Sequence, residues 1–415
     1  MIATHQQFAS TPNGRNGIIQ LLERYRQDTR PGKLNLTVGI YTDETGRCPI
    51  LESVRQAERY RMEHQTSKAS FNIVGAPAFH QAVRAILFPA LPADVDDPRI
   101  RVIQTLGASG ALHLAGQLLD RHLPAARIWM SAPTWENHAA LLSVNRGGFG
   151  TYRYLPASPE RLCLNTILAD LQAAAPGDIV LWHVCCHNPT GIDPDLKQWE
   201  ILASFCAERQ LIPLFDFAYQ GFAHSIQRDA APLAMFMERL DTLLICSSFS
   251  KNMGIYDERT GALTLVCRDA DRLARWNEDV KVLVRSSYSM PPLHGSFIAS
   301  HIINDADCFA SWQQEVSGIR DDLHRRRAAF ISELENVGIL DDVLPYRHQQ
   351  GMFLCLDLSG ASIERLRAEY GVYLLDSGRI SIASLGKDDM ARFCDTLVCV
   401  TREGEQLPSI GYGQD

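Results

Sequence analysis

The sequence lacks the features that mark membrane, secreted and nucleic-acid-binding proteins. None of its apolar runs is long enough to span a bilayer, and its first residues, MIATHQQFASTPNG, contain no apolar signal-peptide core. It has no block of basic residues, and its formal net charge is −8, so nothing favours binding to a polyanion. These absences predict a cytoplasmic protein with no membrane or nucleic-acid partner, which binds small molecules or another copy of itself.

The sequence patterns of disulfide, metal-binding and nucleotide-binding frameworks are also missing. The 11 cysteines occur singly or as the pair Cys185-Cys186, without C-x-x-C spacing, which argues against a disulfide framework and a zinc ribbon and favours a reducing compartment. HVCCHN lacks further metal ligands at suitable spacing, so we predict no metal. GASGAL, which begins at Gly107, is neither G-x-G-x-x-G nor followed by a Walker lysine, which argues against dinucleotide and P-loop sites.

What the chain does contain is an alternation of short β-rich runs with helical patterns, such as those at 111–121 and 196–209. The runs are apolar on both faces, which is typical of parallel strands covered by helices. We therefore predict an α/β fold with a mostly parallel, seven-stranded sheet. The predicted strands are residues 101–106, 126–132, 151–155, 178–184, 211–217, 242–248 and 262–266.

The pattern changes after residue 305. A long charged amphipathic segment, WQQEVSGIRDDLHRRRAAFISELENVG, predicts a helix at a domain boundary. A strand, a helix, two short strands and a last helix are predicted after it. This order suits a second, smaller α+β domain.

Two strand ends place ionisable side chains next to apolar runs. Lys251, in SSFSKNMG, follows the strand at 242–248, and a desolvated amine there has a lowered pKa and can form a Schiff base. Asp216 ends the run LIPLFDF and needs a partner, such as the ring nitrogen of a pyridine cofactor. Tyr219 can present its phenol to the same turn. The structural alternatives are a lysine that snorkels to solvent, an Asp that caps a helix and a tyrosine packed in the core.

Other candidates follow neighbouring strands. Asn188, in HNPTGIDPD, is held extended by the proline after it, and the small residues and Ser109 of GASG offer backbone N–H groups to a phosphate. Trp135 has the shape to lie flat on an aromatic ring. Arg379 and Arg285 are candidates for carboxylate binding and Arg259 for phosphate. Taken singly, these residues also suit a turn, helix packing, a core tryptophan and surface ion pairs.

The positions of these stretches favour the functional interpretation. Four of them follow successive strands, and ligands of open α/β sheets lie beyond the carboxyl ends of the strands. Together they predict one cofactor site.

The ordered set of motifs resembles the aspartate and aromatic amino acid aminotransferases, which are fold-type I pyridoxal 5′-phosphate enzymes. The likeness runs from LTVGIYTDETG near residue 36 to SGRISIASL near residue 385 and includes CCHNPTGIDP and FDFAYQGFA. The motif residues are Gly107-Ala108-Ser109, Trp135, Asn188-Pro189-Thr190-Gly191, Asp216-x-x-Tyr219, Ser248-x-x-Lys251, Arg259 and Arg379.

The resemblance implies roles for these residues. Lys251 would carry pyridoxal 5′-phosphate and move the proton, Asp216 would pair with the ring nitrogen with His138 behind it, and Arg379 would bind the substrate α-carboxylate. Arg285, donated across a homodimer interface, would meet a distal carboxylate. The implied catalytic residues are Lys251, Asp216 and Tyr219; the other cofactor-binding residues are Gly107, Ala108, Ser109, Trp135, Asn188, Ser248, Arg259 and Ser70; the substrate-binding residues are Gly39, Trp135, Asn188, Arg285 and Arg379.

The implied activity is the transfer of an amino group between an aromatic or acidic L-amino acid and 2-oxoglutarate by a ping-pong mechanism. The implied assembly is a homodimer with shared active sites. Each chain would have a large cofactor-binding domain at 46–310 and a small domain made of 1–45 and 311–415.

The sequence departs from the family at the pocket. Ser70 stands where the family usually has a tyrosine that reaches the neighbouring subunit's phosphate, so one hydrogen bond would be lost or bridged by water. Residues near the substrate that are smaller or less polar than a strict dicarboxylate site would suggest favour aromatic or otherwise bulky amino acids; they are Ala69, Thr42, Cys48 and Met290. Two alternatives stay open: a lyase, decarboxylase or cyclase with the same cofactor, and a cofactor-binding regulator without catalysis.

Overall fold

The centre of the fold is a seven-stranded sheet, seen in a computed structural model that describes residues 17–91, 97–155, 162–344 and 347–402. The strand order is β2-β8-β7-β6-β5-β3-β4, and only β8 runs antiparallel to its neighbours. The strands are β2 (Ile100–Leu106), β3 (Ile128–Ala132), β4 (Phe149–Arg153), β5 (Ile179–His183), β6 (Ile212–Phe217), β7 (Thr242–Ser248) and β8 (Thr260–Cys267). The predicted seven-stranded, mostly parallel sheet is confirmed, with β4 two residues earlier than expected.

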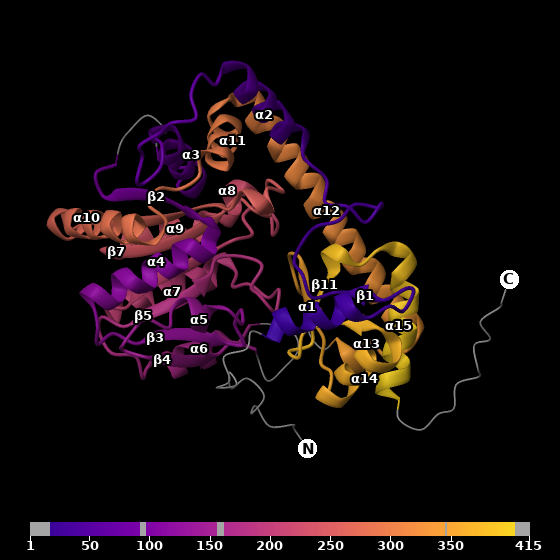
Figure 1. The fold of residues 1–415 in the computed structure, drawn as a ribbon. Coiled ribbons are helices and arrows are strands. Elements are labelled where there is room, and N and C mark those ends of the chain that lie inside the picture. The colour runs from indigo at the N-terminus through magenta and orange to yellow at the C-terminus, as the bar shows by residue number, and fades with distance from the viewer. Residues whose placement is uncertain (1–16, 92–96, 156–161, 345–346, 403–415) are drawn as a thin grey trace.

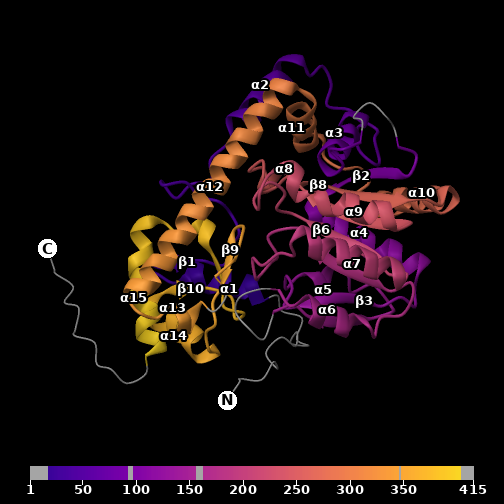
Figure 2. The same ribbon diagram turned by 180° about the vertical axis from the view of Figure 1, so that it is seen from behind.

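Alternate side chains of each strand enter two separate apolar cores. In β7, Leu244 and Cys246 pack with α4 (Gly107–His122) and α10 (Ala270–Ser287) on one face of the sheet. Leu243 and Ile245 belong to the core on the other face, which includes residues of α7 (Leu196–Glu208), α9 (Ala231–Arg239) and α6 (Leu164–Leu171). Figure 1 shows α4 in front of the sheet, and Figure 2, from behind, shows α7 and α9. Burial on both faces explains why the strands read as continuous apolar runs.

A smaller part is built from both ends of the described chain. The early strand β1 (Leu34–Asn35) pairs in parallel with the late strand β10 (Val372–Tyr373). Strand β9 (Phe353–Cys355) pairs antiparallel with β11 (Arg379–Ser381). Figure 1 shows the indigo helix α1 beside the yellow C-terminal helices. These helices are α1 (Gly17–Gln27), α14 (Gly360–Tyr370) and α15 (Lys387–Thr401).

One long helix connects the two parts. Helix α12 (Ala306–Asn336) has 31 residues, which corresponds to a length of roughly 46 Å. Asp305 caps its first turn by accepting hydrogen bonds from the backbone N–H groups of Asp307 and Cys308. One end packs against α2 (Glu52–His64) and α11 (Leu293–Asn304), and the other against α15 (Figure 1). The predicted boundary helix is therefore present.

The remaining helices are shorter. They are α3 (Pro77–Leu87), α5 (His138–Leu141), α8 (Ile226–Asp229) and α13 (Leu340–Val343), with 3₁₀ turns at Tyr256–Glu258 and Ile382–Ser384. Within the described ranges, no helix combines the length and the apolar character that crossing a bilayer requires.

Candidate active site

The predicted site residues gather at the carboxyl ends of the parallel strands. Asp216 is the last but one residue of β6, and Ser248 ends β7, three residues before Lys251. The register of the sheet places His183 of β5 directly beside Asp216. This edge of an α/β sheet is where such folds bind ligands.

Asp216 is a buried carboxylate with one satisfied oxygen. Its Oδ2 accepts a hydrogen bond of 3.0 Å from Nε2 of His138, whereas its Oδ1 has no partner within the described part of the chain. Burial raises the pKa of Asp216, but the His138 hydrogen bond and the nearby positive charges outweigh this and hold the pKa below its usual value. The carboxylate is therefore ionised and has one oxygen available to a ligand.

His138 is itself held in place by a short chain of hydrogen bonds. Its Nδ1 lies 2.8 Å from Thr134 Oγ1, which is 3.2 Å from Nε2 of His183. Burial lowers the pKa of His183 to about 3, so this imidazole is neutral. For His138 to donate to an ionised Asp216, its Nε2 must carry the proton.

Lys251 has the electrostatic setting of a reactive amine. Its side chain is only partly exposed, and Nζ lies 5.1 Å from the ring centroid of Tyr219. Burial lowers the pKa of Lys251 to about 8; the charge of Asp216 opposes this shift, and those of Arg259 and Arg379 add to it. About one tenth of the amine is thus neutral, and nucleophilic, at pH 7.

Arg379 joins the smaller part of the fold to the sheet. It is only 3% exposed. Its Nη1 donates to Asn188 Oδ1 at 2.8 Å, and its Nη2 donates to the carbonyl of Thr37 at 2.7 Å. The guanidinium also lies over the ring of Phe353, 4.3 Å from its centroid, and Phe353 meets Tyr219 edge to face. Burial raises the pKa of Tyr219 above its usual value, so its phenol stays protonated and can donate a hydrogen bond.

The first turn of α4 and Arg259 lie close together and could hold an anion. Gly107 has φ +69°, and a Cβ there would lie 2.8 Å from Nη2 of Arg259. The carbonyl of Arg259 accepts a hydrogen bond from Gly107 N–H at 3.0 Å. Ala108 and Ser109 follow in the same turn, where backbone N–H groups have no partner within the helix. The positive φ favours glycine at residue 107, and a larger residue there would also displace the end of the Arg259 side chain.

Two more predicted residues border this region. Trp135 lies edge to face with His138, at 5.3 Å between ring centroids, and is partly buried. Gly39 lies against Phe353, because a Cβ at this position would be 2.5 Å from Cζ of that ring. Gly39 thus comes from the N-terminal segment to the same place as Arg379.

Ser70 and Arg285 are not brought into this group within one chain. Ser70 accepts a hydrogen bond of 3.0 Å from Asn72 Nδ2. Arg285, in the last turn of α10, is exposed and forms no hydrogen bond or ion pair with the part of the chain that the structure describes. Both were expected to act across a subunit interface.

The sequence did not point to some neighbours of the site. His183 had a usable signal, since it ends the strand next to that of Asp216. Thr37 and Phe353 reach Arg379 from distant parts of the chain, and no local pattern announces them. Glu136 was also missed: its Oε2 lies 3.7 Å from Nη1 of Arg379.

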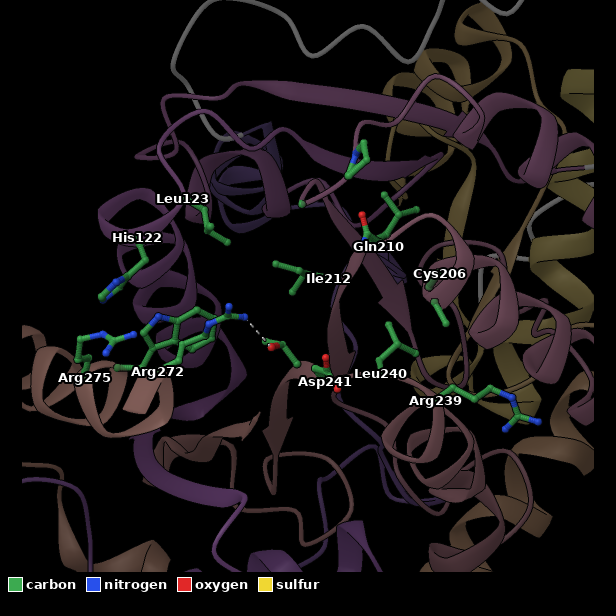
Figure 3. Close-up of a pocket in the computed structure, with 16 residues that line it drawn as sticks. His122, Leu123, Cys206, Gln210, Ile212, Arg239, Leu240, Asp241, Arg272 and Arg275 are labelled. Atoms are coloured by element: carbon green, nitrogen blue, oxygen red, sulfur yellow. Dashed lines mark hydrogen bonds between the residues drawn. The ribbon is translucent and has the colours of Figure 1, made fainter. Parts of the chain in front are cut away.

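A cavity of about 640 Å³ lies elsewhere, at the amino ends of β6 and β7 (Figure 3). Its arginines include Arg239, which pairs with Glu200 at 2.8 Å, and Arg272, which lies 3.8 Å from Asp269. None of the predicted site residues lines it. Among the residues that the structure describes, no group of three or more His, Cys, Asp or Glu side chains is placed to hold a metal.

Comparison with known proteins agrees with this geometry. The family model "Aminotransferase class I and II" matches residues 31–397. An aspartate aminotransferase of Salmonella typhi is 41% identical over 383 residues, which cover 92% of this chain and 97% of that protein. An aromatic-amino-acid aminotransferase of Pseudomonas aeruginosa is 36% identical over 383 residues, 92% and 96% of the two chains.

One similar solved structure contains a bound cofactor. The aromatic-amino-acid aminotransferase of Burkholderia pseudomallei, described as covalently bound to pyridoxal phosphate, superposes with a TM-score of 0.86 at 34% identity. The match covers 97% of this chain and 100% of that one. The predicted fold-type I architecture and aminotransferase activity are confirmed, and the chain belongs to the class I and II aminotransferase family.

Proposed function

We propose that the chain exchanges an amino group between an aromatic or acidic L-amino acid and 2-oxoglutarate, by a ping-pong mechanism with pyridoxal 5′-phosphate. One observation carries the proposal: beside Lys251, whose pKa is lowered to about 8, the ionised Asp216 keeps a buried oxygen without a partner among the described residues. A buried acceptor is costly to leave unpaired, so this oxygen needs a donor that the described residues do not supply.

The residues present fit this cofactor. A protonated pyridine nitrogen is a donor that satisfies Oδ1 of Asp216, and an aldehyde is the partner of a neutral Lys251 amine. The first turn of α4, with Ser248 and Arg259, offers N–H, hydroxyl and guanidinium donors to a phosphate. Asn188 and Tyr219 are assigned to the phenolic oxygen and Trp135 to the ring face.

The cofactor supplies an electron-withdrawing ring that weakens the bonds at the substrate α-carbon. Lys251 moves the proton from that carbon, which its lowered pKa suits because a general base works best with a pKa near the operating pH. The negative charge of Asp216 would stabilise a proton on the ring nitrogen of the cofactor, and His138 holds this carboxylate in position. Phe353 and Tyr219 help to exclude water around Lys251, since both are buried.

Arg379 binds the substrate α-carboxylate in this scheme. A guanidinium can hold a carboxylate through two parallel hydrogen bonds, and Nε of Arg379 is buried without a partner in the part of the chain that the structure describes. Gly39 and Trp135 border the substrate. We expect four small or weakly polar side chains to border the substrate and to favour aromatic donors; they are Ala69, Thr42, Cys48 and Met290.

The assembly we propose is a cytoplasmic homodimer with shared sites, in which Arg285 and Ser70 act on the partner's active site. The exposure of Arg285 and its lack of an ion pair in the described chain support this role. We assign the cofactor to a large domain, 46–310, and the substrate arginine to a small domain, 1–45 with 311–415. The pairing of β1 with β10 supports a small domain drawn from both chain ends.

The test measures the stoichiometry of keto acid release from the purified holoenzyme. With an amino acid alone, an aminotransferase releases one keto acid per active site and stops; added 2-oxoglutarate restores continuous turnover. The Lys251→Ala variant should release none. Continuous product formation without any acceptor would contradict the proposal and support a lyase, decarboxylase or cyclase, an alternative that the aminotransferase relatives do not favour.

A further inference from the structure

Glu136 lies beside the arginine that binds the substrate carboxylate. Its Oε2 is 3.7 Å from Nη1 of Arg379, and Glu136 forms no other ion pair or hydrogen bond with the described residues. The two side chains differ in burial: Arg379 is 3% exposed and Glu136 is 38% exposed. The carboxylate therefore lies on the solvent side of a buried guanidinium.

Glu136 is not what holds Arg379 in place. The guanidinium already donates to Asn188 Oδ1 at 2.8 Å and to the carbonyl of Thr37 at 2.7 Å, and it lies over the ring of Phe353. All three partners are neutral. The distance of 3.7 Å from Glu136 is too long for a hydrogen bond, so this carboxylate acts on the site through its charge.

A substrate carboxylate on Arg379 comes close to this charge. Every amino acid substrate carries the α-carboxylate, so this repulsion is common to all of them. Aspartate, glutamate and 2-oxoglutarate carry a second carboxylate only about 4–6 Å from the first, a separation shorter than the Debye length of roughly 8 Å, so salt does not screen its repulsion from Glu136 fully. Only these substrates feel the repulsion twice.

We propose that Glu136 determines substrate specificity: its carboxylate beside Arg379 disfavours ligands with two carboxylates and shifts preference toward amino acids with uncharged side chains. This inference rests on the proposed function and adds to it a residue that lowers affinity for one substrate class. We take a separation of about 8 Å between Glu136 and the second carboxylate and an effective dielectric constant of about 40 to 80 at this partly exposed position. The repulsion between these two charges then corresponds to about a two- to sixfold change in affinity.

The test compares the holoenzyme with Glu136→Gln, which keeps the shape and removes the charge, and with Glu136→Asp, which keeps the charge. Glu335→Gln is the matched control, because Glu335 is an exposed residue near the end of α12 and its loss changes the net charge equally. The probes are butanedioate, which has two carboxylate groups, and 3-phenylpropanoate, which has one; neither has an amino group. Their dissociation constants are measured at low salt and at about 0.5 M salt.

In Glu136→Gln we expect the Kd of butanedioate to fall about two- to sixfold more than that of 3-phenylpropanoate, and the difference to shrink at high salt. The KM for 2-oxoglutarate should fall with kcat nearly unchanged. Glu136→Asp and Glu335→Gln should keep the wild-type ratio. An equal change for both probes, a change that survives high salt, or weaker binding of butanedioate would overturn the inference.

The same experiment separates this inference from the proposed function. Keto acid release by the wild-type holoenzyme tests the function without reference to Glu136. If the wild type transaminates and Glu136→Gln leaves the probe ratio unchanged, only the role of Glu136 is wrong. If neither probe binds the wild type in a way that Arg379→Ala abolishes, the roles of Arg379 and Glu136 are both wrong, whereas absence of keto acid release would contradict the proposed function.

Discussion

The lowered pKa of Lys251 makes a quantitative prediction about its reactivity. In the cofactor-free protein, Lys251 should react with a neutral acylating reagent much faster at pH 7 than a solvated lysine does. Burial lowers its pKa from 10.5 to about 8, while the charge of Asp216 partly opposes the shift. Asp216→Asn removes that opposing charge, so it should lower the pKa of Lys251 further and make the amine more reactive at neutral pH.

The magnitude follows from the fraction of neutral amine. At pH 7, an amine of pKa about 8 is about one tenth neutral, whereas an amine of pKa 10.5 is about 0.03% neutral. The difference is about 300-fold in reactive species. Restricted access to the partly exposed side chain reduces the observed rate, but it does not change the pH at which the rate levels off.

The assay is labelling of the cofactor-free protein between pH 6 and pH 10, with mass spectrometry of the peptide that contains Lys251. The exposed Lys197 in the same sample is the internal reference. Glu335→Gln controls for the change in net charge of Asp216→Asn. A wild-type rate that keeps rising up to pH 10, or a midpoint that moves upward in Asp216→Asn, would refute the reasoning.

Three further predictions follow from the geometry. The pKa of Lys251 is depressed in the folded state, so the charged amine destabilises the fold below pH 8. Lys251→Met should therefore raise the free energy of unfolding of the cofactor-free protein by about 1–3 kcal/mol below pH 8, a range that is discounted for partial exposure. Urea denaturation should show this gain vanishing as the pH approaches 10.5. Gly39→Ala should press on Phe353, lower stability by about 1–3 kcal/mol and raise KM more than kcat falls; unchanged kinetics and Tm would contradict the close approach. Mixing Lys251→Ala with Arg285→Ala subunits should restore about one quarter of wild-type aspartate turnover through hybrid dimers; no recovery after subunit exchange would contradict the shared site.

The parts of the fold that the sequence predicts are those with strong local patterns. The central strands are buried on both faces, so runs such as the one that ends at Asp216 stand out, and their boundaries agree within a few residues. The strand β4 is less well defined because it lies at the edge of the sheet and is largely exposed, and the structure places it at Phe149–Arg153 instead of 151–155. The very short strands β1 and β10 owe their existence to pairing with each other.

The candidate site also contains some residues that a local sequence pattern predicts and others that only the folded structure brings together. Lys251, Asp216 and Asn188 were predictable because each lies at or just beyond the end of a strand, and the parallel sheet gathers strand ends at one edge. His183 required the register between β5 and β6, which only the folded sheet supplies. The contacts of Arg379 with Thr37 and Glu136 join three distant segments, so no sequence window contains them.

The small part of the fold, drawn from both chain ends, also sets an order of events during synthesis on the ribosome. All seven strands of the central sheet, with Asp216 and Lys251, have left the exit tunnel well before β10 and β11 are made. The strand β1 must therefore wait for its pairing partner β10, and Arg379 takes its place only after β11 is made. Under the proposed roles, the nascent chain therefore holds its cofactor-binding lysine in the folded sheet before its substrate-binding arginine is made.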